Sequence, residues 1–344
     1  MRRSFSAAII FFLVAGFASA QDLSSTIGKV GSKYAQAYVT PAANAFGVDL
    51  NSGLFHTAKV GGMLPFGLNL YVGVQVGAAL ITSSDQSFSM SYLDSVTFME
   101  TYNSRNYTIK VPTAFTVANA PTIFGDKTAG EATFSVLKDT TITSGGFSHT
   151  FHLDSTSTIP TIGGLLKTSI APIPIPQVGV GSLFGTDIFV RYLPKIKLSN
   201  YGSLQLLGYG IRHSISQYIP FSPVDIAVQL GWQNFSLEDS TGSKVLKAST
   251  FAANLEVSKT FAIITLYGGL QTESSTVDVS YSYTPPVTQF NQNPQAIPIS
   301  FSLKGKNTFR TIVGFNLGLG PLLINADYSI GAINAVTAGI GISI

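Results

Sequence analysis

Catalytic or metal chemistry in this chain would first have to use its histidines, which are His56, His149, His152 and His213. His149 and His152 have Asp154 close by, and imidazole and carboxylate groups are common metal ligands. Positions three apart on a strand point to opposite faces, so these two histidines cannot share a metal ion unless the strand bends. We therefore expect no metal site and no cofactor.

A hydrolase that used a histidine would need it beside an enclosed nucleophile. His213 continues the apolar phase of Leu207, Tyr209 and Ile211, which points it away from any such enclosure. The chain has no Gly-x-Ser-x-Gly pattern and no glycine-rich phosphate loop. It also has 0 Cys, which excludes disulfides and thiolate metal sites. These observations predict that the protein is not an enzyme.

Charged residues instead occur singly, in the phase opposite to the apolar one. They are Arg191, Arg212, Asp225, Glu256, Arg310 and Asp327. They could line a pore or a polar gate. Alternatively, they pair with one another and with a segment that fills the enclosed space, because an unpaired buried charge is costly. We favour the pairing interpretation.

The segments that carry these charges alternate between apolar and polar residues with a period of two, which is typical of strands. Their polar phase holds mainly Gly, Ser, Asn and Gln, whereas a water-exposed sheet face usually carries Lys and Glu. Small neutral residues favour a crowded barrel lumen over the alternative, a soluble β-sandwich. We expect Leu255, Val313 and Ile324 to face lipid, and Glu256, Arg310 and Asp327 to face inward.

Composition and the N-terminus support export to a membrane. Arg2-Arg3, the apolar run 7–17 and Ala18-Ser19-Ala20 are typical of a signal peptide cut before Gln21. Charged residues make up 11% of the chain, against about 25% in average globular proteins. No later segment has the roughly 20 apolar residues of a membrane helix. The fold prediction is therefore all-β: an antiparallel transmembrane β-barrel of ten to fourteen strands, in the outer membrane of a Gram-negative bacterium.

We divide the chain into a signal peptide at 1–20, an N-terminal helical plug segment at 21–64, and a membrane β-barrel at 65–344. The barrel would include a large loop region around 82–171. A helix is expected from Asp22 to Tyr38, with Pro41 ending or kinking it. Lys29 and Lys33 would meet inward carboxylates. The plug would place its apolar residues in the lumen, namely Ile27, Val30, Tyr34, Tyr38 and Phe46.

Connection lengths suggest the orientation of the barrel, and prolines bear on the pairing of one strand. The turns at 183–186, 259–261 and 320–321 are short, and short turns lie on the periplasmic side of bacterial barrels. The longer connections at 237–247 and 284–296 would then lie outside. Ile173-Pro174-Ile175-Pro176 disfavours pairing in a central strand, because proline has no backbone N–H to donate.

Two features resemble known families. The last residues, 337–344, resemble the C-terminal signal by which outer-membrane barrels are recognised for assembly, with Ile342 and Ile344 where aromatic residues are usual. A helical segment before a barrel resembles the long-chain fatty-acid and aromatic-hydrocarbon transporter family, which implies that 34–58 lies in the lumen as a plug. The Asn-Pro-Ala element of that family is absent. The stretch 173–194 is similar to related uncharacterised barrels.

Two functions remain open. The first is a passive channel or transporter for small hydrophobic compounds, because a modest strand number and a plug leave no wide water channel. The second is a structural or surface-interaction protein with a closed lumen. Expected partners are outer-membrane lipids, the barrel-assembly machinery through the C-terminal strand and, for transport, a small hydrophobic ligand. Nucleic acid is not an expected partner: without the two arginines of the leader, 18 of the 20 basic residues stand against 17 acidic ones, and this balance argues against a basic face.

Overall fold

The computed structural model describes residues 32–344, apart from 62–67, 103–104, 137–138, 145–146, 152–155, 198–201 and 284–296. Several predictions fall outside these described residues. They concern the signal peptide, Ile27, Lys29, Val30, His152 and Asp154. No helix in the described part of the chain is both long and apolar enough to span a membrane.

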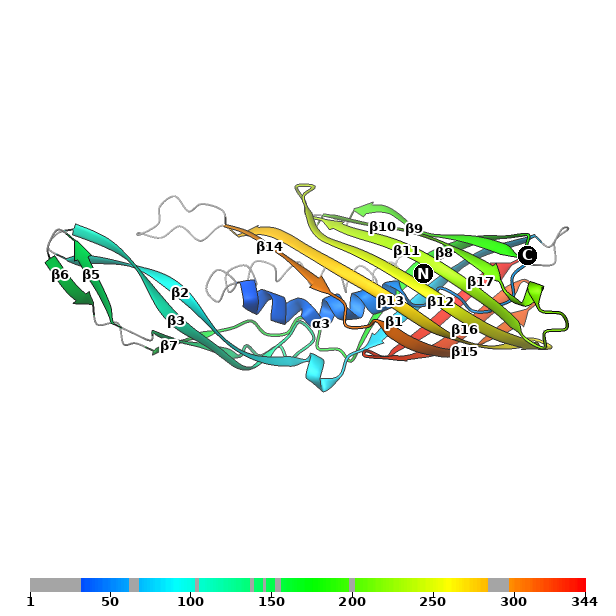
Figure 1. Ribbon diagram of the computed structural model, residues 1–344, viewed down its shortest axis with the longest axis horizontal. Helices are drawn as coiled ribbons and strands as arrows, with labels where there is room; N and C mark the ends of the chain where they lie inside the picture. The colour runs from blue at the N-terminus through cyan, green and yellow to red at the C-terminus, as the bar shows by residue number, and fades with distance from the viewer. Residues whose placement is uncertain are drawn as a thin grey trace, which may run out of the picture. The chain divides into compact units, whose positions relative to one another are not determined.

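Ten strands of the described chain close into an antiparallel barrel around the C-terminal half of helix α3, Ser32–Leu50 (Figure 1). In order around the ring they are β1 (Asn69–Leu80), β8 (Ile170–Leu183), β9 (Thr186–Lys197), β10 (Ser203–Ser214), β11 (Asp225–Glu238), β12 (Lys244–Phe261), β13 (Ile264–Tyr283), β15 (Phe309–Leu319), β16 (Leu322–Gly331) and β17 (Ala335–Ser343). Pairing of β17 with β1 closes the ring. The predicted antiparallel barrel with an N-terminal helix is confirmed.

The two phases of the strands lie on opposite sides of the barrel wall. The exposed fractions of Leu255, Val313 and Ile324 are 49%, 64% and 38%. The exposed fractions of three inward residues, Glu256, Arg310 and Asp327, are 1%, 0% and 7%. Successive strand residues point to opposite faces, so this contrast follows from the period of two alone. The outward face is an apolar surface of the kind that suits lipid.

The two ends of the barrel differ in their connections. The β8–β9, β12–β13 and β15–β16 links are tight turns, and β10 reaches β11 through the short 3-10 helix η4 (Ser216–Tyr218). We call this the short-turn end. Exposed aromatic residues lie there, namely Phe184, Tyr218, Phe221 and Phe261. The opposite end carries the long link between β1 and β8 and the strand β14 (Ile297–Lys304), which pairs with the far half of β13 outside the closed ring, so we call it the long-connection end. Its β11–β12 and β16–β17 links are short, at 239–243 and 332–334, so the longer connection expected at 237–247 is wrong.

The Ile-Pro repeat lies inside a barrel strand, which corrects the expectation that it would not pair centrally. β1 pairs with β8 from Ile170 to Gly181, whereas the described ladder between β8 and β9 begins only at Gln177. Prolines at alternate positions direct their missing N–H groups to the same edge of the strand. That edge faces β9. The prolines therefore leave the β9 side of β8 without backbone donors, while the β1 side keeps its pairing.

The link between β1 and β8, where we expected a large loop region, forms a compact folded unit that contains strands. It begins with the 3-10 helix η2 (Ser83–Asp85). A four-stranded sheet contains β2 (Ser87–Tyr102), β3 (Arg105–Pro121), β4 (Glu131–Val136) and β7 (Thr156–Pro160), and a separate hairpin joins β5 (Thr140–Ser144) to β6 (Phe147–Phe151). Residues 83–167 and the start of α3 cluster together. We call this the inserted unit.

Two predicted plug residues belong to the inserted unit, which corrects their placement in the lumen. Tyr34 and Tyr38 pack with Val117, Ala120 and their neighbours. The Tyr38 hydroxyl donates a hydrogen bond to the Gly163 carbonyl at 3.0 Å, and the Ile162 N–H donates to the Tyr34 hydroxyl at 3.3 Å. Burial raises the pKa of both phenols. An apolar helix face predicts burial, but it does not say against which sheet.

Lys33 and Pro41 also depart from expectation. The Lys33 ammonium lies 4.8 Å from the centre of the Tyr92 ring, as in a cation–π contact, and so does not meet a lumen carboxylate. Helix α3 continues through Pro41 to Leu50. A proline inside a helix removes one backbone hydrogen bond and usually ends or kinks the helix. Contacts made by residues 43–50 inside the barrel stabilise the continued helix.

Candidate functional site: the filled lumen

Residues 40–59, here called the lumen segment, lie inside the barrel in three layers. The layer nearest the long-connection end is apolar. Ala43, Phe46 and Leu50 of α3 lie there against inward side chains of the wall, namely Ile173, Ile175, Leu193, Ile196, Leu204, Leu206, Phe235, Leu237, Ala248 and Val277. The Phe46 and Phe235 rings meet edge to face with centroids 4.7 Å apart. We call this the apolar layer.

The middle layer is polar and is centred on Arg191 of β9. Its guanidinium donates to the carbonyls of Leu50 and Ser52, both at 2.9 Å, and to that of Gly53. The remaining donors reach the side chains of Gln177 and Gln233. All five N–H groups are therefore satisfied, and no carboxylate among the described residues pairs with this arginine. The last carbonyls of a helix lack partners and carry partial negative charge, which suits a buried cation.

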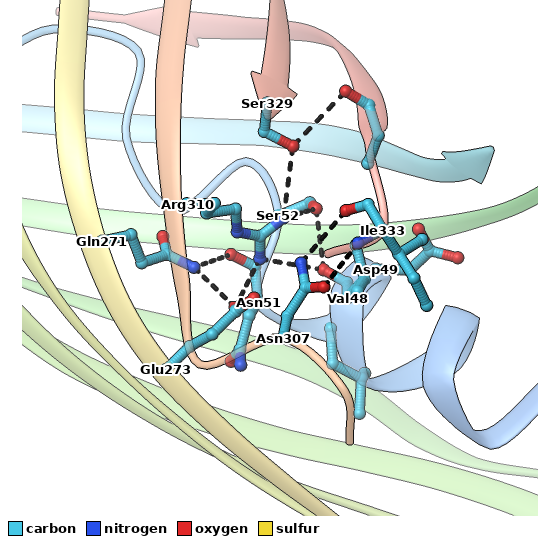
Figure 2. Close-up of polar contacts among 12 residues, drawn as sticks. Val48, Asp49, Asn51, Ser52, Gln271, Glu273, Asn307, Arg310, Ser329 and Ile333 are labelled. Atoms are coloured by element: carbon cyan, nitrogen blue, oxygen red, sulfur yellow. Dashed lines mark hydrogen bonds and ion pairs between the residues drawn. The ribbon is translucent and has the colours of Figure 1, made fainter. Parts of the chain in front are cut away.

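Arg310 holds the same turn from β15, which lies across the ring from β9. Figure 2 shows the contacts of Arg310. It donates to the Val48 carbonyl at 3.1 Å, to the Ser52 hydroxyl at 3.0 Å and to the Glu273 carboxylate at 2.7 Å. Gly53 follows with a φ of +61°, a backbone conformation that glycine adopts without strain. The chain thus leaves the helix through a turn held between two buried arginines.

Amide side chains of the wall complete the polar layer. We call these amides, together with Arg191 and Arg310, the polar clamp. Gln271 donates to the Asn51 carbonyl at 3.2 Å, and Gln233 donates to that of Leu50. The Asp49 carboxylate accepts the Ala79 N–H at 2.7 Å. Inward residues at this level are at most 1% exposed, namely Gln75, Arg191, Gln233, Gln271 and Arg310. Solvent therefore does not reach the middle of the lumen, in contrast to a water-filled porin.

The third layer lies at the short-turn end and is more open. Arg212 donates to the Thr57 carbonyl and to the Asp187 carboxylate, both at 2.6 Å, and lies 3.9 Å from Glu256. The Ala58 N–H donates to the Ser258 hydroxyl at 2.9 Å. A cavity of about 250 Å³ adjoins this layer, lined in part by Leu54, His56, Thr57, Lys59, Tyr71, Asp187, Phe189, Arg212 and Asn316. Four buried side-chain atoms in this lining have no hydrogen-bond partner: His56 Nδ1, Asp187 Oδ1, Arg212 Nε and Asn316 Oδ1.

The structure places the predicted lumen residues at different levels. Arg191 and Arg310 contact the lumen segment in the middle, and Arg212 and Glu256 lie at the short-turn end. Asp327 accepts a hydrogen bond from the Tyr267 hydroxyl at 3.0 Å, and Asp225 is half-buried. The described residues contain no group of three or more His, Cys, Asp or Glu that could hold a metal.

The sequence analysis overlooked the inward glutamines, which provide much of the polar clamp. Gln177, Gln229, Gln233 and Gln271 all contact the lumen segment or its arginines. A signal was present, because Gln229 and Gln233 share the strand phase of Asp225. Neutral amides are common on any polar strand face, so their type alone does not mark a site.

The unpaired edge of β8 borders the apolar layer. Ile173 and Ile175 of this strand, with Leu193 and Ile196 of β9, contact the apolar core of the lumen. The described β8–β9 ladder does not extend to this level of the wall. We call this part of the wall the β8–β9 seam. Here apolar side chains of the lumen meet a stretch of wall that lacks one row of backbone hydrogen bonds.

A search of the known protein families identifies this chain with one that is described as a family of unknown function, DUF6588, which matches residues 1–344. The chain belongs to this family. No curated protein matches it. The predicted resemblance to the fatty-acid and hydrocarbon transporters is not tested by this result and stays a hypothesis.

Solved structures give only distant similarity. The outer-membrane protein OmpT of Vibrio cholerae is 8% identical with a TM-score of 0.24, over 80% of this chain and 99% of that one. The β domain of the Bordetella autotransporter BrkA is 8% identical with a TM-score of 0.29 over the same shares. The outer-membrane channel DcaP of Acinetobacter baumannii is 12% identical with a TM-score of 0.20, over 83% and 100%. At such values the alignments carry no argument about activity.

Proposed function

We propose that this protein is an outer-membrane barrel that passes small hydrophobic compounds between the membrane and its lumen, with the lumen segment controlling passage. The observation that carries the proposal is the apolar layer beside the β8–β9 seam. A hydrophobic molecule in the membrane would meet apolar side chains there with few backbone hydrogen bonds to break. Burial of apolar surface would favour its entry.

Further passage requires movement of the lumen segment, because the polar clamp fills the lumen below the apolar layer. The third layer is the part best suited to move. It adjoins the 250 Å³ cavity, whereas the inward wall side chains of the polar clamp are at most 1% exposed. We propose that residues 51–59 shift into this space, which withdraws the Ser52 and Gly53 carbonyls from Arg191 and opens the polar clamp, while α3 stays in place.

Binding to the apolar layer can be tested with two matched leucines. Leu206 and Leu54 are both 3% exposed, but Leu206 belongs to the apolar layer and Leu54 to the cluster at the short-turn end. We expect Leu206→Gln to weaken binding of the fluorophore N-phenylnaphthylamine to the purified barrel, and Leu54→Gln to leave it nearly unchanged. Equal loss in both variants would contradict a site in the apolar layer.

Movement of the lumen segment can be tested with a disulfide, since the chain has 0 Cys of its own. The Thr57 and Ser258 hydroxyl oxygens are 3.2 Å apart, so Thr57→Cys with Ser258→Cys places two sulfurs at bonding range. We expect the oxidised pair to lose fluorophore uptake in proteoliposomes, and reduction to restore it. The two single variants serve as controls. Unchanged uptake in the oxidised pair would show that this part of the segment does not move during passage.

The second candidate is a structural or surface-interaction protein whose lumen stays closed. The complete burial of Arg191 and Arg310 in the polar clamp favours it, because opening the clamp would expose several satisfied hydrogen bonds. If the wild-type protein neither binds nor passes the fluorophore, this second function replaces the first. For both functions we propose lipid contact along the outward face. Assembly would proceed through β17, which exposes Val336, Ile340 and Ile342 outward.

A further inference from the structure

Contacts along the lumen segment follow one direction through the barrel. Asn44 accepts the N–H of Lys306, a residue between β14 and β15 at the long-connection end. Val48 to Gly53 lie in the polar clamp at mid-height. Thr57 meets Ser258, three residues before the end of β12 at the short-turn end. Residues 44–58 therefore extend through the lumen from the long-connection end to the short-turn end.

A second, independent observation concerns the residues before position 40. Tyr34 and Tyr38 are buried in the inserted unit, together with Val117, Ala132 and Ile162. The inserted unit follows Leu80 of β1 and precedes Ile170 of β8, and these two residues are paired at the long-connection end. The first turns of α3 are thus held by a unit that is joined to the barrel at that end.

The lumen segment is attached to folded structure at both of its ends. Residues before it are packed into the inserted unit, and residues after it continue into β1, which begins at the short-turn end. A plug with a free end could leave the lumen by sliding out. This segment cannot do so without unfolding the core around Tyr34 and Tyr38, so only local rearrangement is open to it.

We infer that the polypeptide crosses the membrane through the lumen of its own barrel between residues 40 and 58, so that residues 32–39 lie on the side of the long connections. Under the proposed outer-membrane placement, on which this rests, that side is the cell surface. The barrel wall must then close around a chain that already passes through it. The N-terminal part of α3 then lies at the cell surface, whereas β1 begins on the periplasmic side of the membrane.

Single cysteines test this crossing, because the chain has 0 Cys and each introduced thiol is unique. Ser32→Cys reports on the start of α3, Ser240→Cys on the β11–β12 loop at the long-connection end, and Ala262→Cys on the β12–β13 turn at the short-turn end. All three positions are exposed. Intact cells are treated with a polyethylene-glycol maleimide too large to cross the outer membrane, and modification is read as a mass shift on a gel. Heat-modifiable migration verifies that each variant has assembled.

The expected result is a mass shift for Ser32→Cys and Ser240→Cys in intact cells, and for Ala262→Cys only after permeabilisation. If Ser32→Cys instead behaves like Ala262→Cys while Ser240→Cys is modified, the crossing is overturned and the membrane placement stands. If Ser240→Cys and Ala262→Cys are modified alike in intact cells, the two barrel ends are not on opposite sides of a membrane. That outcome overturns the placement itself and the crossing with it.

Discussion

The two halves of the lumen segment are held in different ways. Residues 40–50 are helical, pack in the apolar layer, and end on two buried arginines that cap the helix carbonyls. Residues 51–59 are not helical, and their lower part contacts the wall next to a cavity with unpartnered polar atoms. The difference indicates a fixed half and a movable half, because residues 40–50 are packed in an apolar core, whereas the lower part of residues 51–59 adjoins a cavity into which it can move.

The largest expected effect is on the fixed half. Arg191→Ala removes the donor from three carbonyls of the lumen segment, and a buried acceptor without a donor costs about 1–3 kcal/mol. We expect the free energy of unfolding, measured by urea titration in detergent, to fall by about 3 kcal/mol. Arg191→Lys is the matched control. It keeps the charge but not the planar five-donor geometry, so most of the loss should remain. Full stability in Arg191→Ala would show that the clamp does not hold the helix.

Phe46→Ala should have the next largest effect. This ring packs edge to face on Phe235 in the apolar layer, but it is only half-buried. We therefore expect a loss of about 2 kcal/mol, below the roughly 3–5 kcal/mol of a fully buried phenylalanine. The same variant should weaken fluorophore binding if the layer is a ligand site. A variant that loses stability while binding is unchanged would make the apolar layer purely structural.

Arg212→Ala tests the movable half. It removes hydrogen bonds to the Thr57 carbonyl and the Asp187 carboxylate, and we expect a loss of about 1.5 kcal/mol, typical of a hydrogen bond to a charged group. Its main effect should be local. Fluorophore uptake should rise, and a cysteine at Thr57 should react faster with maleimide than in the parent barrel. A loss of stability as large as that of Arg191→Ala would remove the distinction between the halves.

Thr57→Val should have the smallest effect. It deletes the hydroxyl that contacts Ser258 and accepts from the Lys59 N–H, at nearly constant volume. We expect less than about 1 kcal/mol of lost stability, because a neutral hydrogen bond near solvent contributes little. Its uptake should lie between those of the parent and Arg212→Ala. A larger loss than in Arg212→Ala would move the main support of the movable half from the arginine to this hydroxyl.

Local patterns allowed the barrel wall to be predicted but not its contents. The alternation of Leu255 with Glu256 predicts one lipid-facing and one enclosed side chain, since a strand has only two faces. By contrast, Tyr34 and Phe46 have the same apolar character on one helix, yet they pack against different sheets. Their partners are far away in the sequence, and helical periodicity holds no information about them. The same limit hid the glutamines of the polar clamp.

The prolines of β8 show both what the sequence determines and what only the tertiary structure decides. Residues 172, 174 and 176 show from sequence alone that one strand edge cannot donate backbone hydrogen bonds. Which neighbour faces that edge, and that the apolar layer borders it, depends on the order of strands around the ring. Likewise, the sequence by itself determined a strand phase with isolated inward charges. Only the tertiary structure decided that Arg191 and Arg310 bind helix carbonyls. A buried cation needs partners, and only the folded barrel brings the end of α3 within hydrogen-bonding distance of them.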